Sequence, residues 1–326
     1  MTVHASDRPA DPKDDHDDDV APRPPAARPA RALLTAGLLL AGPLPADAKP
    51  RHRYADRIAL PVGFQPEGIA IGRAPVVYSG SRVSGDIFAA DLRTGQGRVI
   101  VPGGGIPALG MKLDGSRLFV AGGASGTGRV VDVRRRAVVR TFTLTRDPDT
   151  FVNDVVLGKR YAWFTDSRQA QLYRVDRRGR STAVTTVPLG GAWEQTAGNN
   201  ANGITLTPDG RALLVVQSST GFLFRVDPGT GVATRVDLGS TLLTNGDGLL
   251  LRGRTLYAVQ NRLNTVAVLR LNRAGTRGTL VDAITSPEFD VPSTVAEYKG
   301  SLYLPNARFG DTPADAIDYQ ITRVSR

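Results

Sequence analysis

Short apolar runs separated by polar turns make up residues 57–326 of the chain. None of the runs continues with the 3.6-residue period of an amphipathic helix. Asp-Gly pairs such as Asp209-Gly210 supply the positive φ angle that a tight hairpin between two strands requires. The pattern predicts short antiparallel strands throughout, and therefore an all-β fold.

The strand pattern also repeats along the chain. Six similar openings begin at residues 67, 109, 153, 202, 247 and 294, which are 42, 44, 49, 45 and 47 positions apart. A repeat of about 40–50 residues built from short strands is typical of one propeller blade. The sequence therefore predicts a six-bladed β-propeller.

The last repeat is shorter than the others and has room for only three strands before the chain ends at Arg326. A further strand-like segment, residues 56–62, precedes the first repeat. Pairing the two would cover exposed strand edges and close the ring. We therefore predict that the N- and C-terminal strands share the closing blade.

The first 48 residues have a different composition from the rest. A Pro-, Ala- and Asp-rich leader is followed by basic residues, an apolar run over residues 32–42, and the tripeptide Ala46-Asp47-Ala48. This order is typical of a secretory signal peptide, and the run is too short to span a bilayer. We predict a leader over 1–48, one propeller over 49–326, secretion and no membrane span. The alternative is a low-complexity tail with a chance apolar patch.

Charge and cysteine content narrow the function classes. The chain has no cysteine, which excludes disulfides, thiolate metal sites and a cysteine nucleophile. The formal net charge is +10, but the arginine clusters at 134–136 and 177–180 fall at predicted hairpin turns with no interleaved aromatic residues. Solvent-exposed turns explain them better than nucleic-acid binding does. We expect a monomer with no nucleic-acid partner.

Four of the six repeats open with a side chain that can offer an oxygen ligand. Equivalent positions of successive blades meet at the propeller axis, so these side chains should converge. They are Glu67, Asn153, Asn202 and Asp247. An all-oxygen set that includes two carboxylates favours a hard divalent cation, Ca²⁺ first, with Mg²⁺, Mn²⁺ or Zn²⁺ as other possibilities. Any one of them alone could instead line a water-filled channel.

The same face of a propeller also collects the ends of the second strands. This position contributes four polar candidates for contact with a substrate, namely Asp166, Ser218, Asn261 and Asn306. A long insertion over residues 190–200 brings Trp193 toward this face, as a lid or as plain surface.

The four ligand-bearing segments resemble those of the SMP-30/gluconolactonase/LRE superfamily, over roughly residues 60–310. The similar segments are Phe64–Gly68, Asn153-Asp154, Asn202–Gly210 and Asp247-Gly248. The resemblance implies a six-bladed propeller that binds a divalent metal through Glu67, Asn153, Asn202 and Asp247. It also implies a metal-dependent hydrolase of small-molecule lactones or related esters, with Asp247, or Asp154 beside Asn153, as the general base.

The chain departs from this family at two points. Gluconolactonase-type members have an arginine two residues before the middle asparagine, where this chain has Phe151. The only histidines, His4, His16 and His52, precede the propeller, which excludes a histidine-assisted mechanism. The alternative function is a non-catalytic secreted propeller, a ligand-binding or scaffold protein with a structural metal ion.

Overall fold

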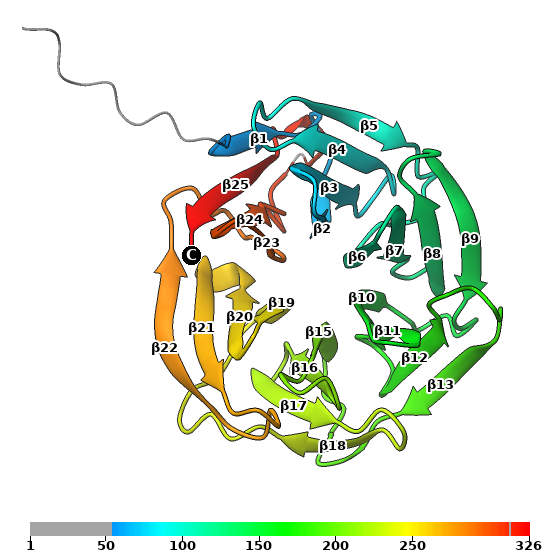
Figure 1. Cartoon of the computed structure of the whole chain (residues 1–326), viewed down its shortest axis with the longest axis vertical. Helices are drawn as coiled ribbons and strands as arrows, with labels where there is room; N and C mark the ends of the chain where they lie inside the picture. Colours follow the sequence, from blue (N-terminus) through cyan, green and yellow to red (C-terminus); the bar gives the residue numbers. More distant parts are fainter. Residues whose placement is uncertain (1–53, 313) are drawn as a thin grey trace, which may run out of the picture. The chain divides into compact units, whose positions relative to one another are not determined.

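Six small antiparallel sheets surround a common axis in the computed structural model (Figure 1). The structure describes residues 54–312 and 314–326, so the predicted leader and all three histidines lie outside it. The described residues include only two short 3₁₀ helices, Asn261–Leu263 and Ala314–Ala316. The predicted all-β six-bladed propeller is confirmed.

In blades one, two, three and five the four strands run from the inner strand outward in chain order. Blade one contains β2 (Pro66–Ile71), β3 (Val76–Ser81), β4 (Ile87–Asp91) and β5 (Gly97–Val101). Blade two contains β6 (Met111–Asp114), β7 (Arg117–Ala121), β8 (Thr127–Asp132) and β9 (Ala137–Thr143). Blade three contains β10 (Val152–Leu157), β11 (Tyr161–Asp166), β12 (Gln171–Asp176) and β13 (Val184–Pro188).

Blade four has a fifth, short strand at its outer edge, β14, which pairs in parallel with β18. Its strands are β14 (Gly190–Gly191), β15 (Ala201–Leu206), β16 (Leu213–Gln217), β17 (Phe222–Val226) and β18 (Val232–Arg235). Blade five contains β19 (Gly246–Arg252), β20 (Thr255–Gln260), β21 (Thr265–Leu271) and β22 (Gly278–Thr285).

Blade six joins the two ends of the described chain, as predicted. It consists of β23 (Ala296–Tyr298), β24 (Ser301–Pro305), β25 (Gln320–Ser325) and β1 (Arg57–Ala59). Strand β1 pairs antiparallel with β25, with Ile58 opposite Ile321. The Ile58 side chain is 1% exposed, and Asp56 forms an ion pair with Arg323. Hydrogen bonds, apolar burial and charge thus all contribute to closure of the ring.

The apolar core lies between the blades. Each buried apolar cluster of the described chain draws its residues from two neighbouring blades, so every blade packs on both faces. Strands β2, β10 and β15 each bury five of their six residues, because they are covered on both sides. This is why they are nearly continuously apolar after their polar start.

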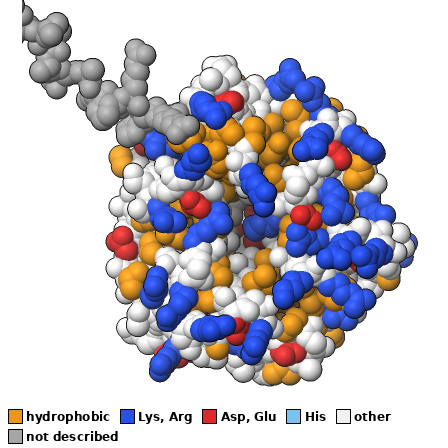
Figure 2. Space-filling model, viewed as in Figure 1, with side chains coloured by type: hydrophobic (Ala, Val, Ile, Leu, Met, Phe, Trp, Pro, Cys, Tyr) orange, Lys and Arg blue, Asp and Glu red, His pale blue; other side chains and the backbone are white. Residues whose placement is uncertain are grey.

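Most charged side chains of the described residues lie on the outside of this framework. Figure 2 shows Lys and Arg side chains spread over one face among apolar and uncharged surface, and not gathered into one band. Within the described residues, no helix is long and apolar enough to cross a membrane.

Candidate metal centre

A repeated β-bulge positions the four candidate ligands. In β2, β10, β15 and β19 the pairing with the next strand shifts register between the first and the fourth residue. The second residue of each strand falls inside this irregularity, and it is Glu67, Asn153, Asn202 or Asp247. A bulge redirects a side chain away from the regular alternation of the strand. The same local distortion, repeated in four blades, therefore brings four polar side chains to one place.

That place is a cavity of about 570 Å³ to which all four side chains contribute. All four are more than nine-tenths buried, with exposed fractions between 4% and 7%. Ser218 and Asn261, two of the predicted substrate-face residues, also line this cavity. The structure thus brings together six of the residues singled out from the sequence.

The two asparagines are oriented by serines at the ends of the second strands. Asn153 donates its amide N–H to Ser167 Oγ at 2.9 Å, and Ser167 donates its only proton to the carbonyl oxygen of Ala201 at 2.8 Å. Asn202 and Ser218 repeat the arrangement one blade further on. Because each hydroxyl proton is already used, the serine can only accept from the amide. The amide nitrogen therefore faces the serine, and the amide oxygen is left for another partner.

Asp247 is held in a comparable way by the residue at the matching position of its own blade. Asn261 donates its amide N–H to Asp247 Oδ2 at 2.7 Å. The ligand candidates in blades three, four and five are thus each fixed by a polar side chain that follows the second strand.

Two oxygen atoms in this set are buried without a hydrogen-bond partner, namely Glu67 Oε2 and Asn153 Oδ1. A buried polar atom without a partner costs about 1–3 kcal/mol, and more when it is charged. Such atoms are rare in native proteins, and two from different blades share one cavity here.

Burial and neighbouring negative charges disfavour the ionised form of both carboxylates. Burial, followed by the charges of Asp247 and Asp154, raises the pKa of Glu67 well above its ordinary value. Burial also raises the pKa of Asp247 to about 7, against the opposing effect of the Asn261 hydrogen bond. A divalent cation would satisfy the free oxygens and neutralise both carboxylates, so the donor set fits a hard cation.

Among the described residues, neither histidine nor cysteine lines this cavity. Among residues 54–312 and 314–326, no group of three or more His, Cys, Asp and Glu side chains is placed to hold a metal ion. The candidate set has two carboxylates and two amides, and any site here depends on the amide oxygens.

Asp154 does not line the cavity, although it neighbours Asn153. Its Oδ1 accepts the N–H of Val155 at 2.7 Å and lies 3.7 Å from Lys112 Nζ. Its Oδ2 accepts the N–H of Ile204 in the next blade at 3.2 Å. At the matching position blades one, four and five have glycine. The side-chain bond from Asp154 to the next blade therefore has no equivalent at those three glycines.

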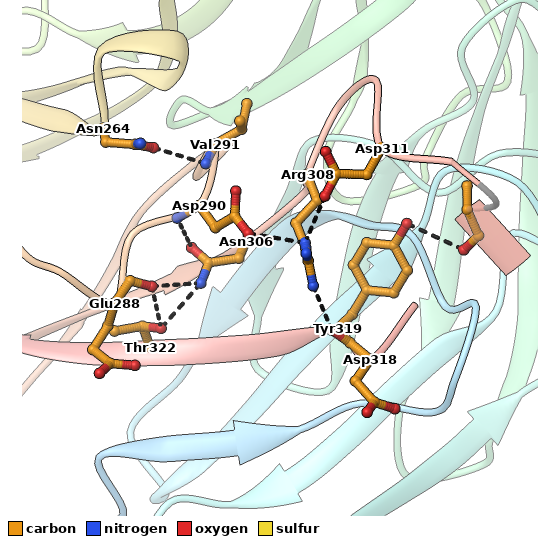
Figure 3. A network of polar contacts seen from close by, with 11 residues as sticks. Asn264, Glu288, Asp290, Val291, Asn306, Arg308, Asp311, Asp318, Tyr319 and Thr322 are labelled. Carbon is orange, nitrogen blue, oxygen red and sulfur yellow. Dashed lines mark hydrogen bonds and ion pairs between the residues drawn. The ribbon is translucent and has the colours of Figure 1, made fainter. Parts of the chain in front are cut away.

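Two further sequence candidates, Asp166 and Asn306, also lie outside the cavity lining. Asp166 is fully buried and accepts hydrogen bonds from Thr150, Tyr173 and the N–H of Phe151. It thereby holds the chain segment that leads into Asn153. Asn306 accepts from the N–H of Asp290 and donates to the carbonyl oxygen of Glu288 (Figure 3). Both side chains therefore bind neighbouring parts of the chain and have a structural role. Their position at the end of a second strand could not distinguish this role from contact with a substrate.

Trp193 is part of the core and does not line the cavity. Its ring packs 4.9 Å from that of Phe224 within the cluster between blades three and four. The insertion does reach the cavity, but through residues 197–199.

Arg82, Arg262 and Phe309 line the cavity and were not among the sequence candidates. Arg82 could have been predicted from the sequence, because it directly follows the second strand of blade one, as Ser218 and Asn261 follow the second strands of their blades. Phe309 could not have been predicted, because it lies in the irregular segment between β24 and β25, where no repeat pattern applies.

Fold and site together define a six-bladed β-propeller with a central cavity lined by oxygen donors. The solved structures that it resembles include the Malassezia sympodialis allergen Mala s 1, at 16% identity and a TM-score of 0.61, over 82% of this chain and 96% of that one. They also include a gluconolactonase from Xanthomonas campestris, at 14% identity and 0.57, over 83% and 91%. A calcium-binding regucalcin from Agrobacterium tumefaciens is similar at 16% and 0.56, over 84% and 96%.

These likenesses confirm the propeller fold that the superfamily resemblance implied. At identities of 14–16% they do not show that this chain shares the activity of any of these proteins. No protein-family model matches the sequence, and no curated protein matches it either.

Proposed function

We propose that this chain is a divalent-metal-dependent hydrolase of lactones or related esters. The observation that carries the proposal is the pair of buried, unpartnered oxygens, Glu67 Oε2 and Asn153 Oδ1, on a cavity shared with Asp247. A structural ion between blades would need the same donors, but not an accessible cavity of about 570 Å³ beside them. This volume suits a small-molecule ligand.

The residues that line the cavity would have two roles, metal binding and substrate contact. Glu67, Asn153, Asn202 and Asp247 would hold the ion. The bound ion would polarise the ester carbonyl and stabilise the negative charge that develops on its oxygen. Pro107, Leu109 and Phe151 supply an apolar wall for the carbon skeleton of the substrate.

Asp247 is the better of the two candidates for general base. It lies on the cavity, and Asn261 fixes one of its oxygens, so that the carboxylate can orient and deprotonate an attacking water molecule. Asp154 has both oxygens occupied by backbone N–H groups of Val155 and Ile204. Its contribution is to hold Asn153 and its neighbouring blade in place.

Turnover of a panel of lactones and aryl esters tests the proposal. Metal-stripped protein should be inactive, activity should return on titration with Ca²⁺, and Asp247→Asn should abolish it. Asp227→Asn, in an exposed turn, is the matched control and should keep full activity. Activity that survives chelation or the Asp247 substitution would overturn the proposal. Ca²⁺-dependent stabilisation with no turnover of any substrate would support the non-catalytic alternative.

We also propose that the mature protein is secreted, on the signal-like sequence of residues 1–48 alone. N-terminal sequencing of material from the culture medium should find a start near Lys49. A mature protein that keeps the Asp-rich leader would contradict it.

A further inference from the structure

One position of the repeat is filled differently in blade one. The residue after the paired second-strand end is Ser167 in blade three, Ser218 in blade four and Asn261 in blade five. Each of these binds the candidate ligand of its own blade. In blade one the pairing of Pro66 with Ser81 puts Arg82 at this position. An arginine thus stands where the other blades have a short, neutral side chain.

Arg82 does not bind the ligand candidate of its own blade. No ion pair joins Arg82 to Glu67 within 4.0 Å among the described residues, and Glu67 Oε2 is itself without a partner. The backbone N–H of Arg82 is fixed on the carbonyl oxygen of Gln65 at 3.0 Å. The guanidinium, in contrast, makes no hydrogen bond within the described part of the chain, and its Nε is buried without a partner.

The guanidinium packs against an aromatic ring at the cavity. Its central carbon lies 5.5 Å from the centroid of the Phe309 ring, and both residues line the cavity. Stacking stabilises a guanidinium through its face and leaves its N–H edge free to donate. The buried Nε–H of Arg82 is a donor without an acceptor, which a ligand in the cavity could supply.

The segment that presents Phe309 is held in place by a polar network (Figure 3). Arg308 Nε lies 2.9 Å from carboxylate oxygens of both Asp290 and Asp311. The other side of the segment is tied down through Asn306, which bonds to the backbone of residues 288 and 290. Phe309 is therefore a preformed support for Arg82, and the guanidinium is positioned before any ligand arrives.

The charges around the cavity favour an anionic ligand once a cation is bound. The ionisable residues of its lining are Glu67, Asp247, Arg82 and Arg262, whose formal charges cancel. A divalent cation would leave an excess of two positive charges in a confined space. Such a site attracts anions and raises their local concentration.

We propose that Arg82 binds a carboxylate carried by the substrate, so that the substrate class is a lactone or ester that bears a carboxylate. This rests on the hydrolase function proposed above. The planar guanidinium, supported by Phe309, offers paired N–H donors that match the two oxygens of a carboxylate. Arg82 is thus a specificity-determining residue, and it would hold the reacting carbonyl on the side of the cavity where Glu67 and Asp247 lie.

Paired substrates that differ only in charge test the proposal. 5-Oxotetrahydrofuran-2-carboxylate and its primary amide have the same lactone ring, and only the first carries an anion. The wild-type protein should favour the carboxylate in kcat/KM. Arg82→Gln should lower kcat/KM for the carboxylate about 10- to 100-fold and leave the amide within about twofold, which is the range expected for loss of a charge-assisted hydrogen bond.

Two further variants serve as controls. Arg178→Gln removes the same charge from a hairpin turn and should change neither substrate. Arg82→Lys keeps the charge but loses the planar fork, and should recover only part of the preference. Equal losses for both substrates in Arg82→Gln, or a wild type that prefers the amide, would overturn the proposal.

A binding experiment separates this inference from the hydrolase function. 3-Oxocyclopentane-1-carboxylate and its amide cannot be hydrolysed, and their affinities for wild type and Arg82→Gln can be measured by calorimetry with and without Ca²⁺. Selective binding of the carboxylate that is lost in Arg82→Gln supports the anion site even if no lactone is turned over. Turnover of lactones without any such selectivity supports the hydrolase and contradicts the role of Arg82.

Discussion

At the scale of single residues, the site depends on side chains that orient other side chains. Glu67, Asn153, Asn202 and Asp247 offer oxygens, but the direction of the amide oxygens is set by Ser167 and Ser218. Each serine has one proton, which it donates to the backbone of the next blade. The orientation of a ligand in one blade is thereby coupled to the position of its neighbour.

Ser167→Ala should weaken Ca²⁺ binding about 10- to 100-fold, because the amide of Asn153 would lose the acceptor that fixes it. Isothermal titration measures this directly. Ser79→Ala is the matched control: Ser79 is equally buried and bonds to the carbonyl oxygen of Gly68, but touches no candidate ligand. It should lower stability and leave the Ca²⁺ affinity within about twofold. Equal affinity losses in both variants would contradict the orienting role.

The raised pKa of Asp247, about 7 against an unfolded value of 3.8, makes a prediction about pH. A carboxyl group with a raised folded pKa stabilises the fold when protonated, so this stability is lost as pH rises from about 4 to about 7. The loss is on the order of 4 kcal/mol. Chelated wild-type protein should therefore melt at lower temperature at pH 7.5 than at pH 4.5. Asp247→Asn should reduce this dependence and leave the part due to Glu67, whose pKa is also raised by burial. Saturating Ca²⁺ should flatten the profile, and a flat profile in chelated wild type would contradict the prediction.

At the scale of strands, the bulge is the feature that builds the site, and in three of the four blades a glycine follows the ligand candidate within it. The residue after the ligand candidate is Gly68, Gly203 and Gly248 in blades one, four and five. A Cβ atom at Gly203 would lie 2.1 Å from the carbonyl oxygen of Asp247 in the next blade. At these three glycines the inner strand therefore approaches its neighbour too closely for a side chain.

Gly203→Ala should destabilise the protein by about 1–3 kcal/mol, because the backbone of blade five cannot move away without disturbing Asp247. Urea denaturation gives the change in the free energy of unfolding. Gly190→Ala is the control, since a Cβ there meets nothing within 4 Å and the φ angle is ordinary. A Gly203 variant as stable as the Gly190 variant would show that the blades are not so closely packed.

Strand repeats could be predicted from the sequence because most openings combine a polar first residue with an apolar run. The sixth opening is displaced by one residue from the prediction at Thr294. The bridge between Pro292 and Asn306 puts Ser293 at the position of Glu67, and no oxygen ligand in that repeat marked the register.

The loops could not be predicted in the same way. Trp193 packs into the core and Phe309 lines the cavity, and the direction of a loop side chain depends on contacts that no periodic pattern records. Arg82 was missed because the candidates at the second-strand ends were chosen as possible oxygen donors to a substrate, and an arginine offers none.

At the scale of the whole molecule, the ring is closed by one short strand from the N-terminal side. Strand β1 completes blade six, and its central residue, Ile58, is buried against residues of blades one and six. The candidate ligands come from four different blades, so the geometry of the site depends on this closure.

Ile58→Ala should lower the free energy of unfolding by about 2–5 kcal/mol, as expected for a large apolar side chain removed from a packed core. Val62→Ala, four residues later and 62% exposed, should have almost no effect. Chemical denaturation of the two variants measures the difference. A loss of stability in Ile58→Ala no larger than in Val62→Ala would mean that β1 contributes little to closure.

The most direct test of the whole account is a crystal structure grown with Ca²⁺, with anomalous diffraction used to locate the ion. We expect one ion in the central cavity, about 2.3–2.6 Å from side-chain oxygens of Glu67, Asn153, Asn202 and Asp247. An empty cavity at saturating Ca²⁺, or an ion bound by other residues, would contradict the account.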